Sequence, residues 1–156
     1  MINFRKASKQ DCKIYFDWAN DEVVREQSFN SNVIAFETHN TWFNTIICNP
    51  KALLLVFENE NKKPIGQVRF QNEENNITVV GVSVDASERG KGFASIILNE
   101  ATNYFLNENK SQILYAYIKV ENTLSIRSFE KAGFLFKENT LYNKIPSILY
   151  TKIINK

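Results

Sequence analysis

The sequence contains few of the residues that build disulfide scaffolds and metal sites. Its 156 residues include two cysteines, Cys12 and Cys48, one histidine and one methionine. A secreted disulfide scaffold of this length carries more cysteines, so two free thiols are the simpler expectation. We also expect no metal ion.

Long apolar runs and an excess of one charge are also absent. No apolar run approaches the roughly 20 residues that span a membrane, and residues 1–6 lack the apolar segment of a signal peptide. These absences predict a cytoplasmic protein with no membrane partner. Lysine and arginine number 19 against 17 acidic residues, a net charge of +2. Because the basic residues are scattered, we expect no nucleic-acid partner.

Hydrophobic residues make up 44% of the chain, which is typical of a folded globular domain. Their periodicity predicts one α/β (α+β) domain over residues 1–156, with about four helices around a mixed, mostly antiparallel sheet of six or seven strands. The expected strands are 2–7, 53–57, 65–70, 77–84, 113–120, 135–138 and 148–153. The expected helices are 8–19, 37–48, 94–107 and 122–132, with a short helix at 23–25.

The stretch from Val82 to Ala94 is the most informative part of the sequence. An apolar strand runs into a loop with glycines at 90 and 92, and a helix follows. The first amides of a helix have no internal partner and lie at the positive end of the helix dipole. Glycines allow a phosphate to approach the backbone closely. The loop therefore predicts a site for a pyrophosphate.

Two common phosphate motifs fit this loop less well. A P-loop requires serine or threonine after its lysine, but Lys91 is followed by Gly92. A dinucleotide fingerprint requires a third glycine, and that position is Ser95. A tight turn that binds nothing remains an alternative for the loop alone.

A second informative segment, Asn122 to Phe134, follows a strand and opens another helix. Asn122, Ser125 and Phe129 share one face of that helix. Phe129 indicates that this face points inward, so the two polar side chains need a partner. That partner is either the backbone, with Asn122 as a helix cap, or a ligand.

Together the two segments, R-G-K-G-F-A and N-x-x-S-x-x-S-F-x-K-A-G-F, resemble the GNAT superfamily of N-acetyltransferases. The order of elements agrees over nearly the whole chain. The resemblance implies an acyl-CoA-dependent N-acetyltransferase with acetyl-CoA as co-substrate. It implies that the pyrophosphate is held by Arg89, Gly90, Lys91, Gly92, Phe93 and Ala94. It also implies cofactor contacts from Val82, Val84, Asn122, Ser125, Phe129 and Lys131.

Within the superfamily, Asn20–Arg25, Ser28-Phe29 and His39-x-x-Trp42-Phe43 are similar to acetyltransferases of nucleotide-linked amino sugars, those of the pseudaminic acid pathway in particular. Ribosomal-protein N-acetyltransferases carry related motifs. The resemblance implies a small-molecule amine acceptor, a nucleotide sugar, bound by a monomer or homodimer. We expect Arg25, Ser28, His39 and Trp42 to contact it.

Proton transfer is where the sequence departs from the family. Many members donate a proton to the departing thiolate from a tyrosine seven residues after the asparagine, and here that residue is Phe129. Tyr142, Tyr115, Tyr117 or water are substitutes, and an unassisted thiolate is another. His39, Glu26 and Glu37 are candidate bases, His39 because its ordinary pKa lies near neutrality.

Three other functions stay open at this point. In the first, the protein acetylates a protein α-amine or another small amine. In the second, it binds CoA without turnover. In the third, it is a purely structural or partner-binding domain.

Overall fold

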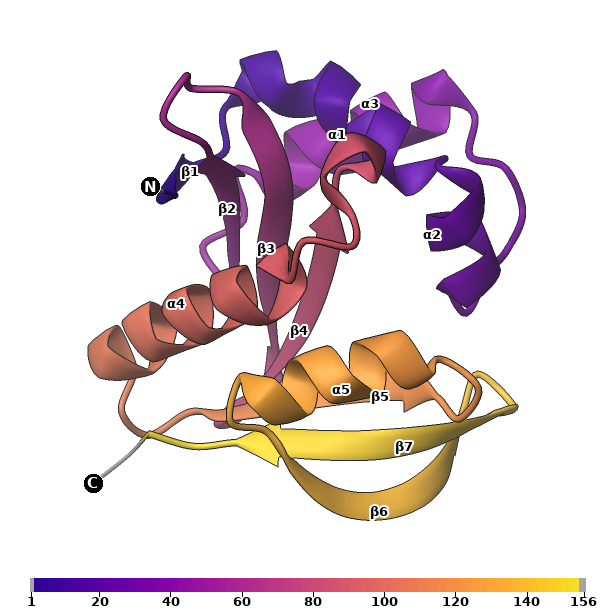
Figure 1. The fold of residues 1–156 in the computed structure, drawn as a ribbon, viewed down its shortest axis with the longest axis vertical. Helices are drawn as coiled ribbons and strands as arrows, with labels where there is room; N and C mark the ends of the chain where they lie inside the picture. The colour runs from indigo at the N-terminus through magenta and orange to yellow at the C-terminus, as the bar shows by residue number, and fades with distance from the viewer. Residues whose placement is uncertain (1, 155–156) are drawn as a thin grey trace.

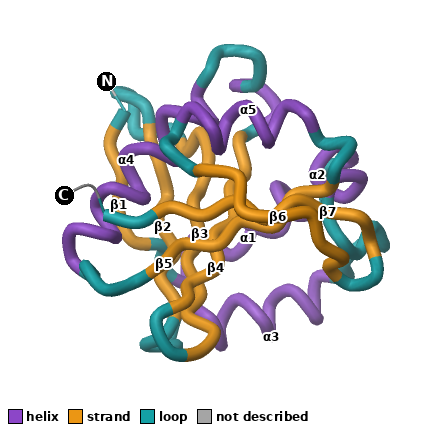
Figure 2. The backbone as a smooth tube through the Cα atoms, turned by 90° about the horizontal axis from the view of Figure 1, so that it is seen from below, coloured by secondary structure: helices purple, strands orange, loops and turns teal. Residues whose placement is uncertain are grey.

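The structure, a computed structural model, describes residues 2–154 as a seven-stranded sheet with helices on both faces (Figures 1 and 2). The strands are β1 (Asn3–Lys6), β2 (Ala52–Glu58), β3 (Pro64–Glu74), β4 (Ile77–Val84), β5 (Ile113–Lys119), β6 (Leu135–Tyr142) and β7 (Ile145–Lys152). The helices are α1 (Cys12–Ala19), α2 (Glu22–Gln27), α3 (Phe36–Ile46), α4 (Phe93–Glu108) and α5 (Thr123–Lys131), with 3-10 turns at Lys9–Asp11 and Ala86–Glu88.

The strand order is β1-β2-β3-β4-β5-β7-β6, and only β4 and β5 are parallel neighbours. Their pairing is short. It runs from Ile77 opposite Ile113 to Val79 opposite Tyr115 and then stops. Both strands continue beyond that point, so they diverge, and Figure 1 shows β5 and β7 turned away from β2–β4. The divergence opens the middle of the sheet.

Helices α4 and α5 cover one face of the sheet, with α3 on the opposite side (Figure 2). The side chains of Ile97, Leu98 and Ala101 on α4 have no exposed surface, which confirms the predicted apolar stripe of that helix. On the other face, α1 and α3 pack Trp18 and Phe43 against β2.

Strand β2 is apolar on both sides because both layers cover it. Leu55 and Phe57 belong to the core under α4 and α5, and Leu54 and Val56 belong to the core under α1 and α3. This confirms the prediction that residues 53–57 form a buried central strand.

The predicted fold class is confirmed: the structure has seven strands, but five α-helices rather than about four. The main local differences lie in polar segments. A 3-10 turn precedes α1, and the Ser8 amide donates to Asp11 at 2.8 Å. Strand β6 runs to Tyr142 rather than 138, because an edge strand tolerates polar residues that hide its pattern. Within residues 2–154, no helix has the length and apolarity needed to cross a membrane.

Gly66 is a point where β3 has no space for a side chain. A Cβ there would lie 2.6 Å from the backbone oxygen of Ser83 and 3.1 Å from Cδ1 of Ile97. We expect Gly66→Ala to lower the free energy of unfolding by about 1–3 kcal/mol, measured by urea denaturation, because backbone must shift. Gly81→Ala is the matched control, since its Cβ would meet only the flexible end of Arg69 at 3.2 Å. Equal losses in the two variants would contradict this account.

Candidate active site

A cavity of about 580 Å³ lies where β4 and β5 separate. It is lined by α2, the diverging parts of β4 and β5, the loop before α4, the first residues of α4, and α5. The volume falls within the usual range for sites that bind small molecules and cofactors. The early end of the β4–β5 pairing therefore creates this cavity.

The cavity passes through the sheet from one face to the other. Val82, Val84 and Ile118 line it and pack with the core under α4 and α5. Gly81, Ser83 and Tyr117 line it as well, and alternation along the strands places them on the opposite face. One side of the cavity thus adjoins α4 and α5, and the other adjoins α2. We refer to them as the α4 side and the α2 side.

The free edge of β4 faces the cavity. The amide of Ile113 donates to the carbonyl of Asn76 at 2.6 Å, so the peptide groups of even-numbered β4 residues point toward β5. Beyond Val79 strand β5 no longer pairs with them. The peptide groups of Val82 and Val84 therefore point into the space between β4 and β5. Both residues are among those predicted from the sequence to contact the cofactor.

The backbone amides of residues 90–95 have no hydrogen-bond acceptor among residues 2–154. Gly90, Gly92, Phe93, Ala94 and Ser95 line the cavity, and α4 begins there without a side-chain cap. The positive end of the α4 dipole adds to these unpaired donors. The arrangement suits an anion with several oxygens, as a diphosphate has.

Gly90 and Gly92 both have φ of 79°, in the left-handed region that favours glycine. A Cβ at either position would meet no atom within 4 Å. Packing within the protein therefore does not require glycine at these positions. The backbone conformation and an open approach to the amides do.

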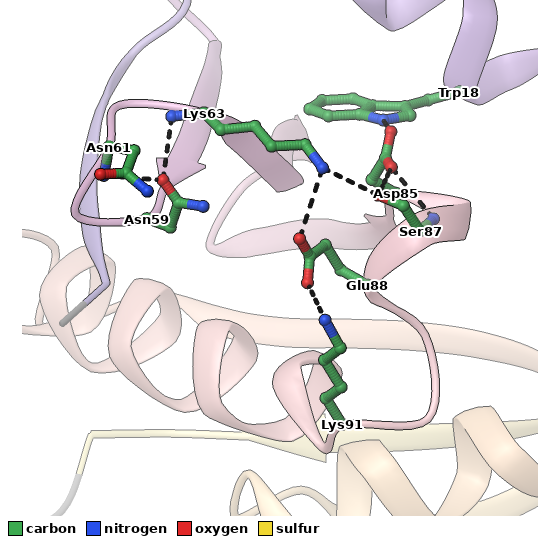
Figure 3. A network of polar contacts seen from close by, with 8 residues as sticks. All are labelled: Trp18, Asn59, Asn61, Lys63, Asp85, Ser87, Glu88 and Lys91. Atoms are coloured by element: carbon green, nitrogen blue, oxygen red, sulfur yellow. Dashed lines mark hydrogen bonds and ion pairs between the residues drawn. The ribbon is translucent and has the colours of Figure 1, made fainter.

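Side chains from distant parts of the chain fix the loop before α4 (Figure 3). Asp85 accepts from the Trp18 indole at 2.8 Å and from the Ser87 amide at 3.1 Å. Burial raises the pKa of Asp85, but hydrogen bonds from Ser87 and Trp18 outweigh it and hold the pKa below its ordinary value. The carboxylate thus ties the loop to α1.

Glu88 binds two lysines in the same network (Figure 3). Its carboxylate lies 2.7 Å from Nζ of Lys91 and 3.5 Å from Nζ of Lys63. Lys91 is exposed and does not line the cavity. Only its backbone thus remains a candidate for contact with the cofactor.

Arg89 joins the loop to α2. Its Nη2 lies 2.7 Å from Oδ1 of Asp21, and the same carboxylate oxygen accepts the amides of Val23 and Val24 at the start of α2. Burial raises the pKa of Asp21, but the Arg89 hydrogen bond and the helix amides hold it below its ordinary value. The loop and α2 are therefore mechanically connected.

The four predicted residues of the second segment all line the cavity: Asn122, Ser125, Phe129 and Lys131. Asn122 caps α5, because its Oδ1 accepts the Ser125 amide at 3.2 Å. Phe129 is 4% exposed and packs edge-on against Phe134, with ring centroids 4.9 Å apart. No hydroxyl replaces the missing tyrosine at this position.

Tyr117 is the tyrosine that lines the cavity. Tyr142 lies outside it and stacks on Tyr117 with centroids 4.3 Å apart, and Phe29 packs edge-on against Tyr142. Tyr115 accepts a hydrogen bond from Lys137 at 3.2 Å. Burial, with nearby Tyr115 and Tyr142, raises the pKa of Tyr117, so its hydroxyl keeps its proton at neutral pH.

His39 does not lie in the cavity, which contradicts its predicted roles as base and acceptor contact. The residue is 2% exposed, and Nε2 is 3.0 Å from the Cys12 carbonyl, to which it donates. Burial lowers its pKa. The reason is amphipathic packing: His39 is on the inner side of α3, against Phe16 and Phe43.

Three other predicted residues also lie outside the cavity. Arg25 donates to the carbonyls of Ala19, Asn30 and Asn32, so its guanidinium holds the loop after α2 rather than an acceptor phosphate. The Glu26 side chain is on the exposed surface of α2. Its backbone carbonyl accepts a hydrogen bond from Nζ of Lys119 at 3.0 Å. Trp42 packs against Arg69.

Of the predicted acceptor contacts, only Ser28 lines the cavity. Its hydroxyl donates to the Val24 carbonyl at 2.6 Å and accepts from Arg25. Sequence reasoning missed Gln27, Lys119 and Arg127, which line the cavity too. The position of Lys119 at the end of an apolar strand was the only indication in the sequence that it lines the cavity.

The model of the acetyltransferase (GNAT) domain family matches residues 2–135 of the chain. The protein belongs to the GNAT acetyltransferase family. The GNAT domain confirms the predicted acyl-CoA-dependent N-acetyltransferase, with acetyl-CoA as co-substrate. A search of curated protein sequences finds no match.

Solved structures share this GNAT fold at low identity. Spermidine N-acetyltransferase from Vibrio cholerae, in complex with CoA and spermine, is 18% identical with a TM-score of 0.84, over 96% of this chain and 93% of that one. The aminoglycoside acetyltransferase AAC(6')-Ib, in complex with paromomycin and acetyl-CoA, is 16% identical with a TM-score of 0.82, over 97% and 93%. These relatives leave the resemblance to pseudaminic acid pathway enzymes unconfirmed.

The unpaired amides of the GNAT loop predict how CoA binding responds to a methyl group. We expect Gly92→Ala to weaken CoA binding at least tenfold by calorimetry, because its Cβ points into open space at the amides and strains a left-handed residue by about 1–2 kcal/mol. The control is Lys91→Ala, which removes an exposed side chain outside the cavity. Unchanged CoA affinity in Gly92→Ala would contradict a diphosphate at these amides.

Proposed function

We propose that the protein transfers the acetyl group of acetyl-CoA to the amino group of a nucleotide-linked sugar, by direct attack in a ternary complex. The observation that carries the transferase reaction is the row of unpaired amides at residues 90–95 beside the free edge of β4. The acceptor part of the proposal rests on the charges around the cavity.

In this proposal the α4 side of the cavity holds the cofactor. The amides of residues 90–95 bind the diphosphate, and the peptide groups of Val82 and Val84 bind the pantetheine arm as a strand would. Arg127 and Lys131 line the cavity on α5, where their charges suit the nucleotide end. The amine then approaches the thioester from the α2 side.

The basic character of the cavity favours an anionic acceptor. Of the basic lining residues, Arg127 and Lys131 face the nucleotide end of the cofactor in this proposal and Arg89 is paired with Asp21, so Lys119 is the one left for the acceptor; the acidic lining residue is Glu88. Glu88 is already paired with two lysines. Glu73 and Glu138 are close enough to raise the pKa of Tyr117, but neither lines the cavity.

A polyamine or aminoglycoside would leave its cations without partners here. The two solved relatives are described with spermine and paromomycin, which carry several amino groups. Desolvating a cation without a carboxylate partner is costly. A nucleotide sugar reverses that balance, since its diphosphate carries negative charge. A cytoplasmic location and a monomeric or homodimeric state stay predictions.

A panel of amines tests the acceptor. We expect acetyl-CoA-dependent thiol release with UDP-glucosamine at a kcat/KM at least tenfold above that with spermidine, kanamycin or a peptide with a free N-terminus. Faster turnover of spermidine or kanamycin would overturn the nucleotide-sugar assignment, and activity only on the peptide would favour a protein acceptor. Tight CoA binding with no release from any amine would indicate a binding module without turnover.

Proton transfer to the thiolate falls to a residue other than Phe129. Attack of the neutral amine forms the C–N bond and breaks the C–S bond. The thiolate that leaves takes up a proton, and the nitrogen gives up one proton to water, from which the donor is reprotonated. We infer that Tyr117 donates it, since it lines the cavity on β5, keeps its proton at neutral pH and is buttressed by Tyr142. Tyr142, another candidate from the sequence, then acts through Tyr117.

Removing one hydroxyl tests this role. We expect Tyr117→Phe to lower kcat about 100-fold, as for loss of a general acid, with the KM for acetyl-CoA unchanged. Tyr115→Phe is the matched control, because Tyr115 is on the same face of β5 and does not line the cavity. An unchanged kcat in Tyr117→Phe would show that the thiolate leaves without this donor.

A further inference from the structure

The guanidinium of Arg69 on β3 has no hydrogen-bonding or ion-pair partner among residues 2–154. No side chain or carbonyl among residues 2–154 forms a hydrogen bond or an ion pair with it. The residue is partly buried, and burial lowers its pKa, with Tyr15 acting weakly in the opposite sense. A guanidinium in such a position is normally paired with a carboxylate or a phosphate.

The guanidinium is held in place by packing. Its Cζ lies over the ring of Trp42 on α3, 5.5 Å from the ring centroid. A Cβ on Gly81 would lie 3.2 Å from its Nη2, so the side chain crosses β4 at a residue that has no side chain. Gly81 faces Arg69 in the β3–β4 register.

This crossing brings the guanidinium beside Gly81, which lines the cavity, while Arg69 itself lies just behind the lining. Gly81 lines the cavity on the α2 side, where we place the acceptor. The nitrogens of Arg69 are not among the fully enclosed unpaired polar atoms, which are Tyr15 Oη, Gln27 Oε1 and Gln67 Oε1. They therefore keep some exposed surface.

No carboxylate among residues 2–154 competes for the Arg69 guanidinium, whose one charge partner is the weakly acting Tyr15. Lys119 is on the same face, at the end of β5, and donates to a backbone carbonyl. The one carboxylate that lines the cavity, that of Glu88 on the loop before α4, is paired with Lys63 and Lys91. An oxyanion at Arg69 would thus meet an open set of guanidinium donors that no carboxylate occupies.

We propose that Arg69, laid across Gly81 and backed by Trp42, binds an oxyanion of the acceptor and selects acceptors that carry one. The inference rests on the proposed function and deepens it: Arg69 takes the role for which the sequence favoured Arg25. A phosphate and a carboxylate share the chemistry that a guanidinium recognises. Trp42, predicted as an acceptor contact, then acts through Arg69.

A binding experiment tests the site independently of turnover. The protein is first saturated with CoA, so that the amides at residues 90–95 are occupied, and then titrated with UDP or with malonate by calorimetry and tryptophan fluorescence. We expect UDP to bind the wild type, and Arg69→Gln to bind it about 10- to 100-fold more weakly, as for loss of a charge-assisted contact. Binding of malonate instead, lost in the same variant, would identify a carboxylate as the ligand.

Two further variants separate recognition from structure. Gly81→Ala keeps the charge but displaces the guanidinium, and we expect it to weaken UDP binding as well. Lys137→Gln removes a cation that contacts Tyr115 outside the cavity, and it should bind UDP like the wild type. CoA affinity equal to wild type in Arg69→Gln verifies that the fold is intact.

Kinetics with matched amines complete the test. In Arg69→Gln we expect the KM for UDP-glucosamine to rise about 10- to 100-fold at an unchanged kcat, with Arg69→Lys in between and glucosamine unaffected. Absence of both UDP and malonate binding in the wild type, or equal binding in Arg69→Gln, would overturn the Arg69 site even if acetyl transfer occurs. Absence of transfer to any amine, with Arg69-dependent UDP binding retained, would overturn the proposed function and leave the site standing.

Discussion

The separation of β4 from β5 after three residue pairs is the feature on which the other properties of this molecule depend. A parallel pair that continued to Val84 would use the peptide groups of Val82 and Val84 within the sheet and would close the cavity. Because pairing stops, one strand edge stays unsatisfied in the interior, which proteins tolerate where a ligand or water completes the hydrogen bonds. The unpaired amides at the start of α4 lie at the same opening. Two sets of unsatisfied backbone donors therefore converge on one cavity.

The cavity is also where the two layers of helices become connected. Arg89 and Asp21 join the loop before α4 to the start of α2, so a residue beside the unpaired amides holds a helix on the α2 side of the cavity. Asp85 and Trp18 join the same loop to α1. The loop before α4 is thus coupled to α1 and α2 through two half-buried carboxylates. Glycine contributes in two ways, by its φ at positions 90 and 92 and by its missing side chain at position 81, where Arg69 crosses the strand.

Much of this could be predicted from local sequence patterns. The strand, the glycine loop and the amphipathic helix at residues 77–108 are contiguous, so their periodicity predicted both the elements and the amides at their junction. The acceptor side could not be predicted in the same way, because it is assembled from α2, β3, β4 and β5. His39 illustrates the difficulty: a lone histidine suggested a base, yet its position on α3 packs it against Phe16 and Phe43. The unpaired state of Arg69 could not be predicted either, because a single polar residue in a strand indicates only the face of the sheet on which it lies.

The central claim is that the amides of residues 90–95 and the free edge of β4 bind the cofactor together. Backbone amide resonances of isotope-labelled protein, followed during titration with CoA, test it most directly. The account predicts the largest shifts at Gly90, Gly92 and Ala94, from the diphosphate, and at Val82 and Val84, from the pantetheine arm. Large shifts elsewhere with these five amides unchanged would contradict it.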